Sequence, residues 1–157
     1  MTEDLIVADC IDLVADSIAD LPQDRPVLVG VDGVDGSGKT TFAAALRERV
    51  VGRPSTIIHL DDFLNPPHLR HARGRDSAEG FWLDTYDYPA FRRVLADSAE
   101  AGANAAIIVE GMFLHRDELA NLWARATIVI DNTDLATPRR IEPAEACAND
   151  SGVHEQQ

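Results

Sequence analysis

One eight-residue stretch constrains the fold of this chain more than any other. Residues 33–40 read GVDGSGKT, in which Gly33 and Gly38 are separated by four residues and followed by Lys39 and Thr40. The apolar run VLVGVD at 27–32 leads directly into this stretch. A Gly-x-x-x-x-Gly-Lys-Thr pattern after a strand and before a helix is typical of a loop that binds phosphate. Residues 33–40, here called the phosphate loop, are therefore predicted to bind a nucleotide.

The residue types of the phosphate loop suit this chemistry. Glycines let successive backbone amides point inward, and the following helix adds its positive end. Lys39 is expected to reach the outer phosphates, and the Thr40 hydroxyl to ligate a Mg²⁺ ion that bridges them. The alternative is an ordinary glycine-rich turn. The predicted nucleotide-binding residues are Gly33, Val34, Asp35, Gly36, Ser37, Gly38, Lys39, Thr40 and Thr41.

The charge of the chain limits its partners. The formal net charge is −13 and the sequence pI is near 4.6, so no basic field is available to attract nucleic acid or an anionic membrane. Among 14 basic residues, Lys39 is the only lysine. A phosphate ligand must therefore be held locally, by backbone amides, a few cations and a metal ion.

Strand and helix patterns alternate along the chain, which predicts an α/β fold with a mainly parallel sheet and helices on both faces. An acidic amphipathic helix is expected over residues 3–20, and residues 66–80 are expected to form a surface loop. Strands are predicted at 27–32, 55–60, 105–111 and 126–131, and the intervening helices at 40–51, 87–102 and 116–124.

The 157 residues suit one domain. We divide it into an N-terminal helix packed on the core (1–22), a core that carries the phosphate loop (23–135), and a polar tail (136–157) with at most one short helix. Cys10 and Cys147 have neither disulfide nor metal spacing, the acidic start is unlike a signal peptide, and no stretch approaches a membrane span. A cytoplasmic location is expected.

Two acidic residues follow or close predicted parallel strands. Parallel sheets bind ligands at the carboxyl ends of their strands. Asp61 directly follows the second strand and could accept the proton of an attacking hydroxyl. The alternative is that Asp61 or Asp62 only caps the next turn. Glu110 closes the third strand and could hold the metal directly or through water, or could simply face solvent.

Five blocks of the sequence carry a resemblance to a known family. In order they are VGVDGVDGSGKTTFA, IHLDDFL, RGRDSAEGFWLDTYDYPAF, IIVEGMFLHRDELANLW and IVIDNTDLATPRR. Over roughly residues 24–140 they resemble the uridine kinase and phosphoribulokinase group of P-loop kinases. The resemblance implies the P-loop NTPase fold and four residue roles. Asp61 would be the catalytic base, Asp87 would hold sugar hydroxyls, Glu110 would lie near the metal, and Asp131 would precede a lid.

The chain also departs from the pattern of this group. The lid of the group brings several arginines onto the transferring phosphate, but here only Arg139 and Arg140 follow the fourth strand. The hairpin that helps these kinases grip a base is replaced by the direct connection ADSAEAGANAA. Arg73 and Arg75 could bind substrate and partly replace the missing cations, or could merely be solvated.

The leading hypothesis is a phosphotransferase that uses Mg²⁺ and ATP, with Asp61 and Lys39 as catalytic residues and a nucleoside or another small alcohol as acceptor. The alternative is a nucleotide-binding module or degenerate kinase. A third hypothesis is that a partner subunit in an oligomer supplies the missing parts. A GTPase is less favoured because no Asn-Lys-x-Asp motif is present. His59, His68, His71 and His115 lack metal-ligand spacing, so packing or solvent-facing roles are predicted for them.

Overall fold

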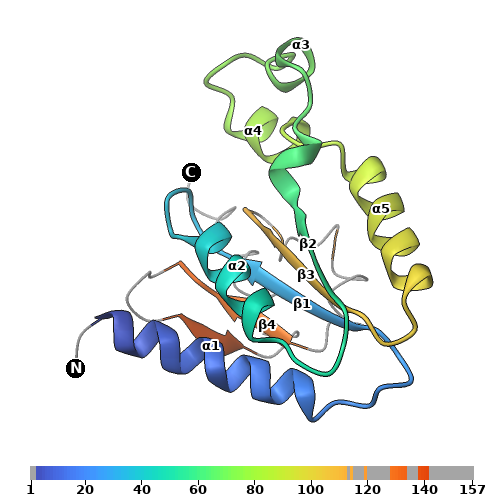
Figure 1. Cartoon of the computed structure of the whole chain (residues 1–157). Coiled ribbons are helices and arrows are strands. Elements are labelled where there is room, and N and C mark those ends of the chain that lie inside the picture. Colours follow the sequence, from blue (N-terminus) through green and yellow to red (C-terminus); the bar gives the residue numbers. More distant parts are fainter. Residues whose placement is uncertain (1–2, 113, 115–118, 120–127, 134–137, 142–157) are drawn as a thin grey trace.

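A single sheet forms the centre of the molecule in the computed structural model, which describes residues 3–112, 114, 119, 128–133 and 138–141 (Figure 1). Among these residues, five strands are ordered β2-β3-β1-β4-β5. The first four are parallel, and β5 runs antiparallel to β4 at the edge. The strands are β1 (Val27–Asp32), β2 (Ser55–His59), β3 (Ala106–Gly111), β4 (Ile128–Asp131) and β5 (Arg139–Ile141).

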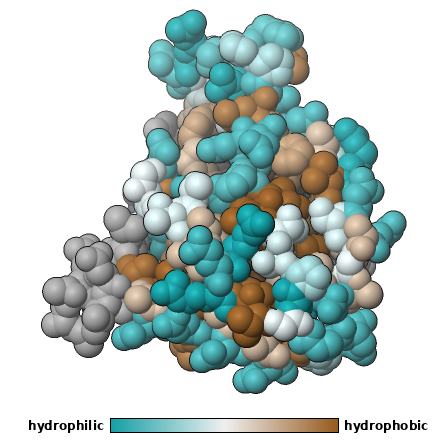
Figure 2. Space-filling view, viewed as in Figure 1, coloured by the Kyte–Doolittle hydropathy of each residue, from teal (hydrophilic) through white to brown (hydrophobic). Residues whose placement is uncertain are grey.

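Helices pack on the sheet, and two short helices lie beyond one end of it. In Figure 1, α1 and α2 lie in front of the sheet, and the segment with α3 and α4 projects beyond the end of β2. The surface of this projecting part is mainly hydrophilic in the same view (Figure 2). The helical elements are α1 (Glu3–Ala19), α2 (Lys39–Arg49), the 3-10 turn η1 (Leu60–Phe63), α3 (Pro67–Arg70), α4 (Ala78–Asp84) and α5 (Tyr88–Ala101).

The first face of the sheet is covered by α1 and α2. Alternate strand residues face these helices, because successive side chains of a strand point to opposite faces. In α1 the buried residues Ile11, Val14 and Ile18 recur at helical spacing, while the aspartates at positions 9, 12 and 16 are exposed. The other buried residues of this cluster are Ala15, Val27, Val29, Val31, Phe42, Ala43, Leu46, Ala106, Ile108, Ile128 and Ile130.

The second face of the sheet is covered by α5. Phe91 and Leu95, four residues apart on α5, pack against Ile107 and Val109 of β3. The β3 residues from 106 to 111 are all buried, as expected of a central parallel strand with both faces covered. The predicted α/β fold, with a mainly parallel sheet and helices on both faces, is therefore confirmed.

Two segments differ from the sequence prediction. Residues 66–80, expected to be a surface loop, contain α3 and the start of α4. Pro67 suits the first turn of α3, and the Ser77 hydroxyl caps α4 by accepting a hydrogen bond from the Gly80 amide at 3.0 Å. The segment after Asp131, expected to hold at most a short helix, contains β5. Three residues are too few for a strand periodicity to be recognised.

Some predictions fall on other parts of the chain. The helix predicted over 116–124 lies outside the described residues except for Leu119, which is buried. Residues 142–157 of the predicted tail also lie outside them. Within the described part, no helix combines the length and apolar character needed to cross a membrane.

Candidate functional site

The phosphate loop connects the end of β1 to the start of α2. Gly38 precedes α2 with φ at 76°, a conformation that glycine adopts without strain. A Cβ atom at Gly33 would lie 2.6 Å from Ser37 Oγ and 2.8 Å from the carbonyl oxygen of Asn132, so the backbone needs glycine there. The loop is therefore tightly folded before the first turn of α2, whose amides without a partner in the helix can donate hydrogen bonds to an anion.

Asn132, immediately after β4, anchors the phosphate loop by hydrogen bonds. Its backbone amide donates to the Asp32 carbonyl at 2.7 Å, and its side-chain Nδ2 donates to the Ser37 carbonyl at 2.7 Å. Asn132 is 1% exposed. Sequence reasoning missed this residue, although its place directly after the predicted strand 126–131 is the signal that could have identified it.

The fit of the loop to a phosphate rests on two hydrogen-bond donors of the loop itself. Ser37 is buried, and its hydroxyl has no hydrogen-bond partner among the described residues. A buried hydroxyl without a partner costs free energy, which a ligand that accepts its hydrogen bond would recover. Lys39 is 9% exposed and its Nζ donates to the Val34 carbonyl at 2.7 Å, so the ammonium group lies over the loop. These groups fit an anionic ligand.

The two residues predicted to ligate the metal are in contact. The Thr40 hydroxyl, in the first turn of α2, donates to Glu110 Oε1 at 3.1 Å. Glu110 lies near the end of β3 and is 4% exposed. A hydroxyl and a carboxylate beside phosphate oxygens form a donor set that suits Mg²⁺. The structure brings these residues together, and their metal-binding role stays a prediction.

His59 is a functional candidate that sequence reasoning missed. It is paired with Glu110 in the register of β2 and β3, and its Nδ1 lies 2.6 Å from Glu110 Oε1. The sequence predicted only a packing or solvent-facing role for this histidine. No local spacing could reveal the contact, because it depends on which strands become neighbours.

Asp61 lies in η1, directly after β2, with one carboxylate oxygen anchored. Its Oδ1 accepts a hydrogen bond from the Tyr86 hydroxyl at 2.9 Å. Tyr86 is 2% exposed, and burial together with the hydrogen bond to Asp61 raises the pKa of its phenol well above the usual range. Asp61 and Asp62 are both exposed. The predicted base is thus held on one side and open to solvent on the other.

The backbone of Asp87 contacts η1, the turn that carries Asp61. Its backbone amide donates to the Phe63 carbonyl at 2.7 Å, and Leu64 and Tyr86 form an antiparallel bridge. The carboxylate of Asp87 caps α5, with Oδ1 accepting from the Ala90 amide at 2.9 Å. A capping role is therefore observed, and the predicted contact of Asp87 with sugar hydroxyls stays a prediction.

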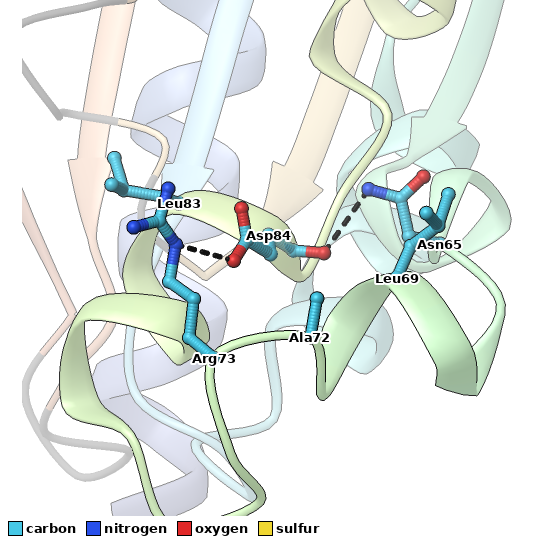
Figure 3. Close-up of a pocket in the computed structure, with 6 residues that line it drawn as sticks. All are labelled: Asn65, Leu69, Ala72, Arg73, Leu83 and Asp84. Atoms are coloured by element: carbon cyan, nitrogen blue, oxygen red, sulfur yellow. Dashed lines mark hydrogen bonds and ion pairs between the residues drawn. The ribbon is translucent and has the colours of Figure 1, made fainter.

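Arg73 lies in the wall of a hollow of about 390 Å³ in the projecting part (Figure 3). Its Nε donates to Asp84 Oδ2 at 2.8 Å, and its Nη1 lies 3.6 Å from Glu79 Oε1. Arg75 is exposed in the segment between α3 and α4. The structure thus places Arg73 in ion pairs within the projecting part, and substrate binding by Arg73 and Arg75 stays a prediction. The hollow is lined by Asn65, Leu69, Ala72, Arg73, Leu83 and Asp84.

Asp131 ends β4, as the sequence predicted, and is paired with β5. Arg139 donates to its Oδ2 from Nε at 3.1 Å and from Nη2 at 3.0 Å. Burial raises the pKa of the Asp131 carboxyl, but hydrogen bonds from Thr133 and the interaction with Arg139 outweigh burial and lower it below its ordinary value. One of the two arginines that follow β4 is therefore held at the sheet edge.

Comparisons with known proteins find a relative by sequence and solved structures with a similar fold. The chain is 28% identical over 142 residues to a uridine kinase of Lactiplantibacillus plantarum, a match that covers 75% of this chain and 68% of that protein. A solved structure of a possible uridine kinase from Bacillus stearothermophilus has a TM-score of 0.66 at 21% identity and covers 80% of each chain. No model of a protein family matches the sequence.

A second solved structure extends the comparison of folds. It is a candidate fructose transport system kinase from Silicibacter sp. TM1040, with a TM-score of 0.59 at 20% identity, and it covers 100% of this chain and 84% of that one. The α/β fold described above is therefore shared with both solved structures.

Proposed function

We propose that this chain is an ATP-dependent phosphotransferase of the P-loop kinase type. Its similarity in sequence to a uridine kinase and in fold to a possible uridine kinase supports the proposal. It moves the terminal phosphate of Mg-ATP to a hydroxyl of a small molecule, for which a nucleoside is the simplest candidate. The observation that carries the proposal is the contact at 3.1 Å between the Thr40 hydroxyl of the phosphate loop and the buried carboxylate of Glu110.

The phosphate side of the reaction is assigned to the phosphate loop. The amides of residues 33–40 and the start of α2 bind the phosphate oxygens of ATP, and Lys39 neutralises charge on the outer phosphates. Thr40 and Glu110 are the residues that would hold Mg²⁺, and the ion would offset the negative charge of the transferring group. These interactions orient the terminal phosphate for transfer.

The acceptor side is assigned to the carboxylates near the end of β2. Asp61 removes the proton from the acceptor hydroxyl as the new oxygen–phosphorus bond forms and the bond between the β- and γ-phosphates of ATP breaks, releasing ADP. Asp87 holds neighbouring hydroxyls of the acceptor. Arg73 and Arg75 are proposed to assist acceptor binding. The transfer is direct and in line, with no covalent intermediate.

A second candidate function is a nucleotide-binding module with little transferase activity. The observation that favours it is the double hydrogen bond from Arg139 to Asp131, which keeps one of the arginines after β4 occupied at the sheet edge. Arginines that stabilise the transferring phosphate commonly contribute on the order of 10³-fold or more to the rate. Their absence from the phosphate would leave binding intact and transfer slow.

An assay with ATP labelled on its terminal phosphate separates the two functions. The protein is incubated with Mg-ATP and a panel of nucleosides and other small alcohols, and labelled products are separated by chromatography. We expect transfer by the wild type and a loss of about 10²-fold or more in Asp61→Asn, because general-base catalysis contributes that much. Asp62→Asn, which changes the neighbouring exposed carboxylate, is the matched control and should retain transfer.

One outcome would count against the kinase, and another against the role given to Asp61. Binding of Mg-ATP without transfer to any acceptor would support the nucleotide-binding module. Equal transfer by the wild type and Asp61→Asn would remove Asp61 from the role of base.

A further inference from the structure

His59 makes a contact that the reaction outlined above does not use. It is the last residue of β2, and its ring nitrogen Nδ1 lies 2.6 Å from Oε1 of Glu110, its register partner on β3. A carboxylate only accepts hydrogen bonds, so the hydrogen of this bond is on Nδ1. The side chain of Glu110 is 5% exposed, whereas that of His59 is 36% exposed. The histidine therefore reaches from the surface to a buried carboxylate.

Both side-chain contacts of Glu110 use the same oxygen. Oε1 accepts from His59 Nδ1 at 2.6 Å and from the Thr40 hydroxyl at 3.1 Å. Two donors that approach one oxygen from different elements restrict rotation of the carboxylate about its terminal bond. Among the described residues, this arrangement leaves Oε2 as the oxygen available to a cation beside Thr40.

His59 could have a purely structural role, because a buried carboxylate such as that of Glu110 is costly without hydrogen bonds. The position of Glu110 makes orientation relevant as well. Its carboxylate touches the first turn of α2, immediately after the phosphate loop, where a displaced oxygen would no longer meet a metal held by Thr40. Residues that hydrogen-bond to metal ligands typically orient them, and their loss costs about 10- to 100-fold in metal affinity.

We propose that His59 is a positioning residue for the magnesium site: its Nδ1–H fixes the Glu110 carboxylate against Thr40, and the gain in nucleotide affinity on adding Mg²⁺ depends on this bond. The inference rests on the proposed function, because it presumes that Thr40 and Glu110 hold the metal of Mg-ATP. It assigns to the end of β2 a role in metal binding, next to the turn η1 that carries the base Asp61.

Two substitutions at residue 59 separate the hydrogen bond from the packing of the ring. His59→Asn retains an N–H donor near the place of Nδ1, whereas His59→Leu keeps comparable bulk without a donor. His68→Leu, at an exposed histidine of α3, is the control for the general effect of replacing a histidine. Thermal unfolding without nucleotide checks that each variant is folded.

The measurement is the dissociation constant of a non-hydrolysable ATP analogue, by calorimetry, in excess MgCl₂ and in EDTA. The ratio of the two constants is the magnesium enhancement. In His59→Leu we expect this ratio to fall by about 10-fold or more, with the constant in EDTA nearly unchanged. His59→Asn and His68→Leu should keep most of the wild-type enhancement.

The outcomes distinguish this inference from the proposed function. If the wild type shows a clear enhancement and His59→Leu shows the same one, His59 has no positioning role. An equal loss in His59→Leu and His59→Asn would also overturn the proposal, because the donor would then not matter. A wild-type protein whose affinity for the analogue ignores Mg²⁺ would contradict the proposed function itself, and this inference with it.

Discussion

Tyr86 connects the proposed base to the core of the protein. Its ring is buried and packs edge-on against Tyr88, with centroids 6.0 Å apart, while its hydroxyl donates to Asp61 Oδ1. Because burial and the contact with Asp61 raise the pKa of the phenol far above the usual range, Tyr86 stays protonated at neutral pH. A permanent donor on one oxygen of Asp61 leaves the other oxygen to meet the acceptor.

We expect Tyr86→Phe to lower kcat about 10-fold while leaving KM for ATP nearly unchanged, since the change disturbs the base and not the phosphate loop. Stability should fall by only about 1 kcal/mol, because one hydrogen bond is lost and Asp61 remains exposed to water. Steady-state kinetics with ATP varied at fixed acceptor measure the first effect, and urea unfolding the second.

The double variant Asp61→Asn/Tyr86→Phe provides the control for this prediction. If Tyr86 acts through Asp61, the double variant should be no slower than Asp61→Asn alone. Fully additive losses in kcat would show that Tyr86 acts independently of Asp61.

The residues that sequence reasoning identified and those that it missed differ in how far their contacts reach along the chain. Gly33, Gly38, Lys39 and Thr40 are recognisable because their function follows from local spacing. His59 and Tyr86 were missed as functional candidates because their partners lie 51 and 25 residues away. Such contacts exist only after strands β2 and β3 pair and η1 packs beside the start of α5.

The edge strand β5 is joined to β4 by backbone pairing and by one ion pair. It pairs with β4 over Val129–Asp131, and the ion pair between Asp131 and Arg139 closes the end of this ladder. The side chain of Arg139 is 65% exposed, so the pair is partly screened by water. An exposed pair of this kind contributes at most about 1 kcal/mol.

The effect of acid on this contact follows from the sign of the pKa change. The folded protein holds the pKa of Asp131 below its ordinary value of 3.8, so the contribution to stability is present above that pH and is lost as the pH falls through the lower, folded pKa. We expect Asp131→Asn to be up to about 1 kcal/mol less stable than the wild type near neutral pH.

Urea unfolding of the wild type and Asp131→Asn at about pH 7 and about pH 3 checks this expectation. The difference in the free energy of unfolding should be larger at neutral pH and shrink in acid. A difference that grows on acidification would have the wrong sign for a depressed carboxyl pKa.

For elements, the sequence patterns succeeded where the segment is long and buried. Helix α1 and strands β1, β2 and β3 lie where apolar periodicity placed them, within one or two residues at their ends. The short helix α3, the start of α4 and the three-residue strand β5 were missed. Four or fewer residues carry too little periodicity, and β5 is a strand only through its pairing with β4.

The strand order of the whole sheet explains why the candidate site forms at the carboxyl ends of the parallel strands. With the order β2-β3-β1, the ends of three parallel strands meet on the side where β1 enters the phosphate loop. This order places His59 beside Glu110 and brings Glu110 to Thr40. The alternation of strands and helices predicted a parallel sheet, but it did not give the strand order, and hence these contacts could not be predicted.

The net charge of −13 makes the local nature of this site important. A protein with this charge repels free polyphosphate at long range, so affinity must come from short-range donors and a bound cation. Lys39 is the only lysine, and its Nζ already lies over the loop against the Val34 carbonyl. When a phosphate binds, Lys39 Nζ can donate to a charged phosphate oxygen in place of the neutral Val34 carbonyl.

The most direct test of the account is calorimetric titration of the wild type and Lys39→Ala with a non-hydrolysable ATP analogue in MgCl₂. The wild type should bind, and Lys39→Ala should bind about 100-fold more weakly, because a hydrogen bond to a charged group contributes roughly 1.5–3 kcal/mol and each 1.4 kcal/mol is tenfold. Thermal unfolding without nucleotide should change little. Equal affinity of the two proteins would contradict the claim that the phosphate loop holds the triphosphate.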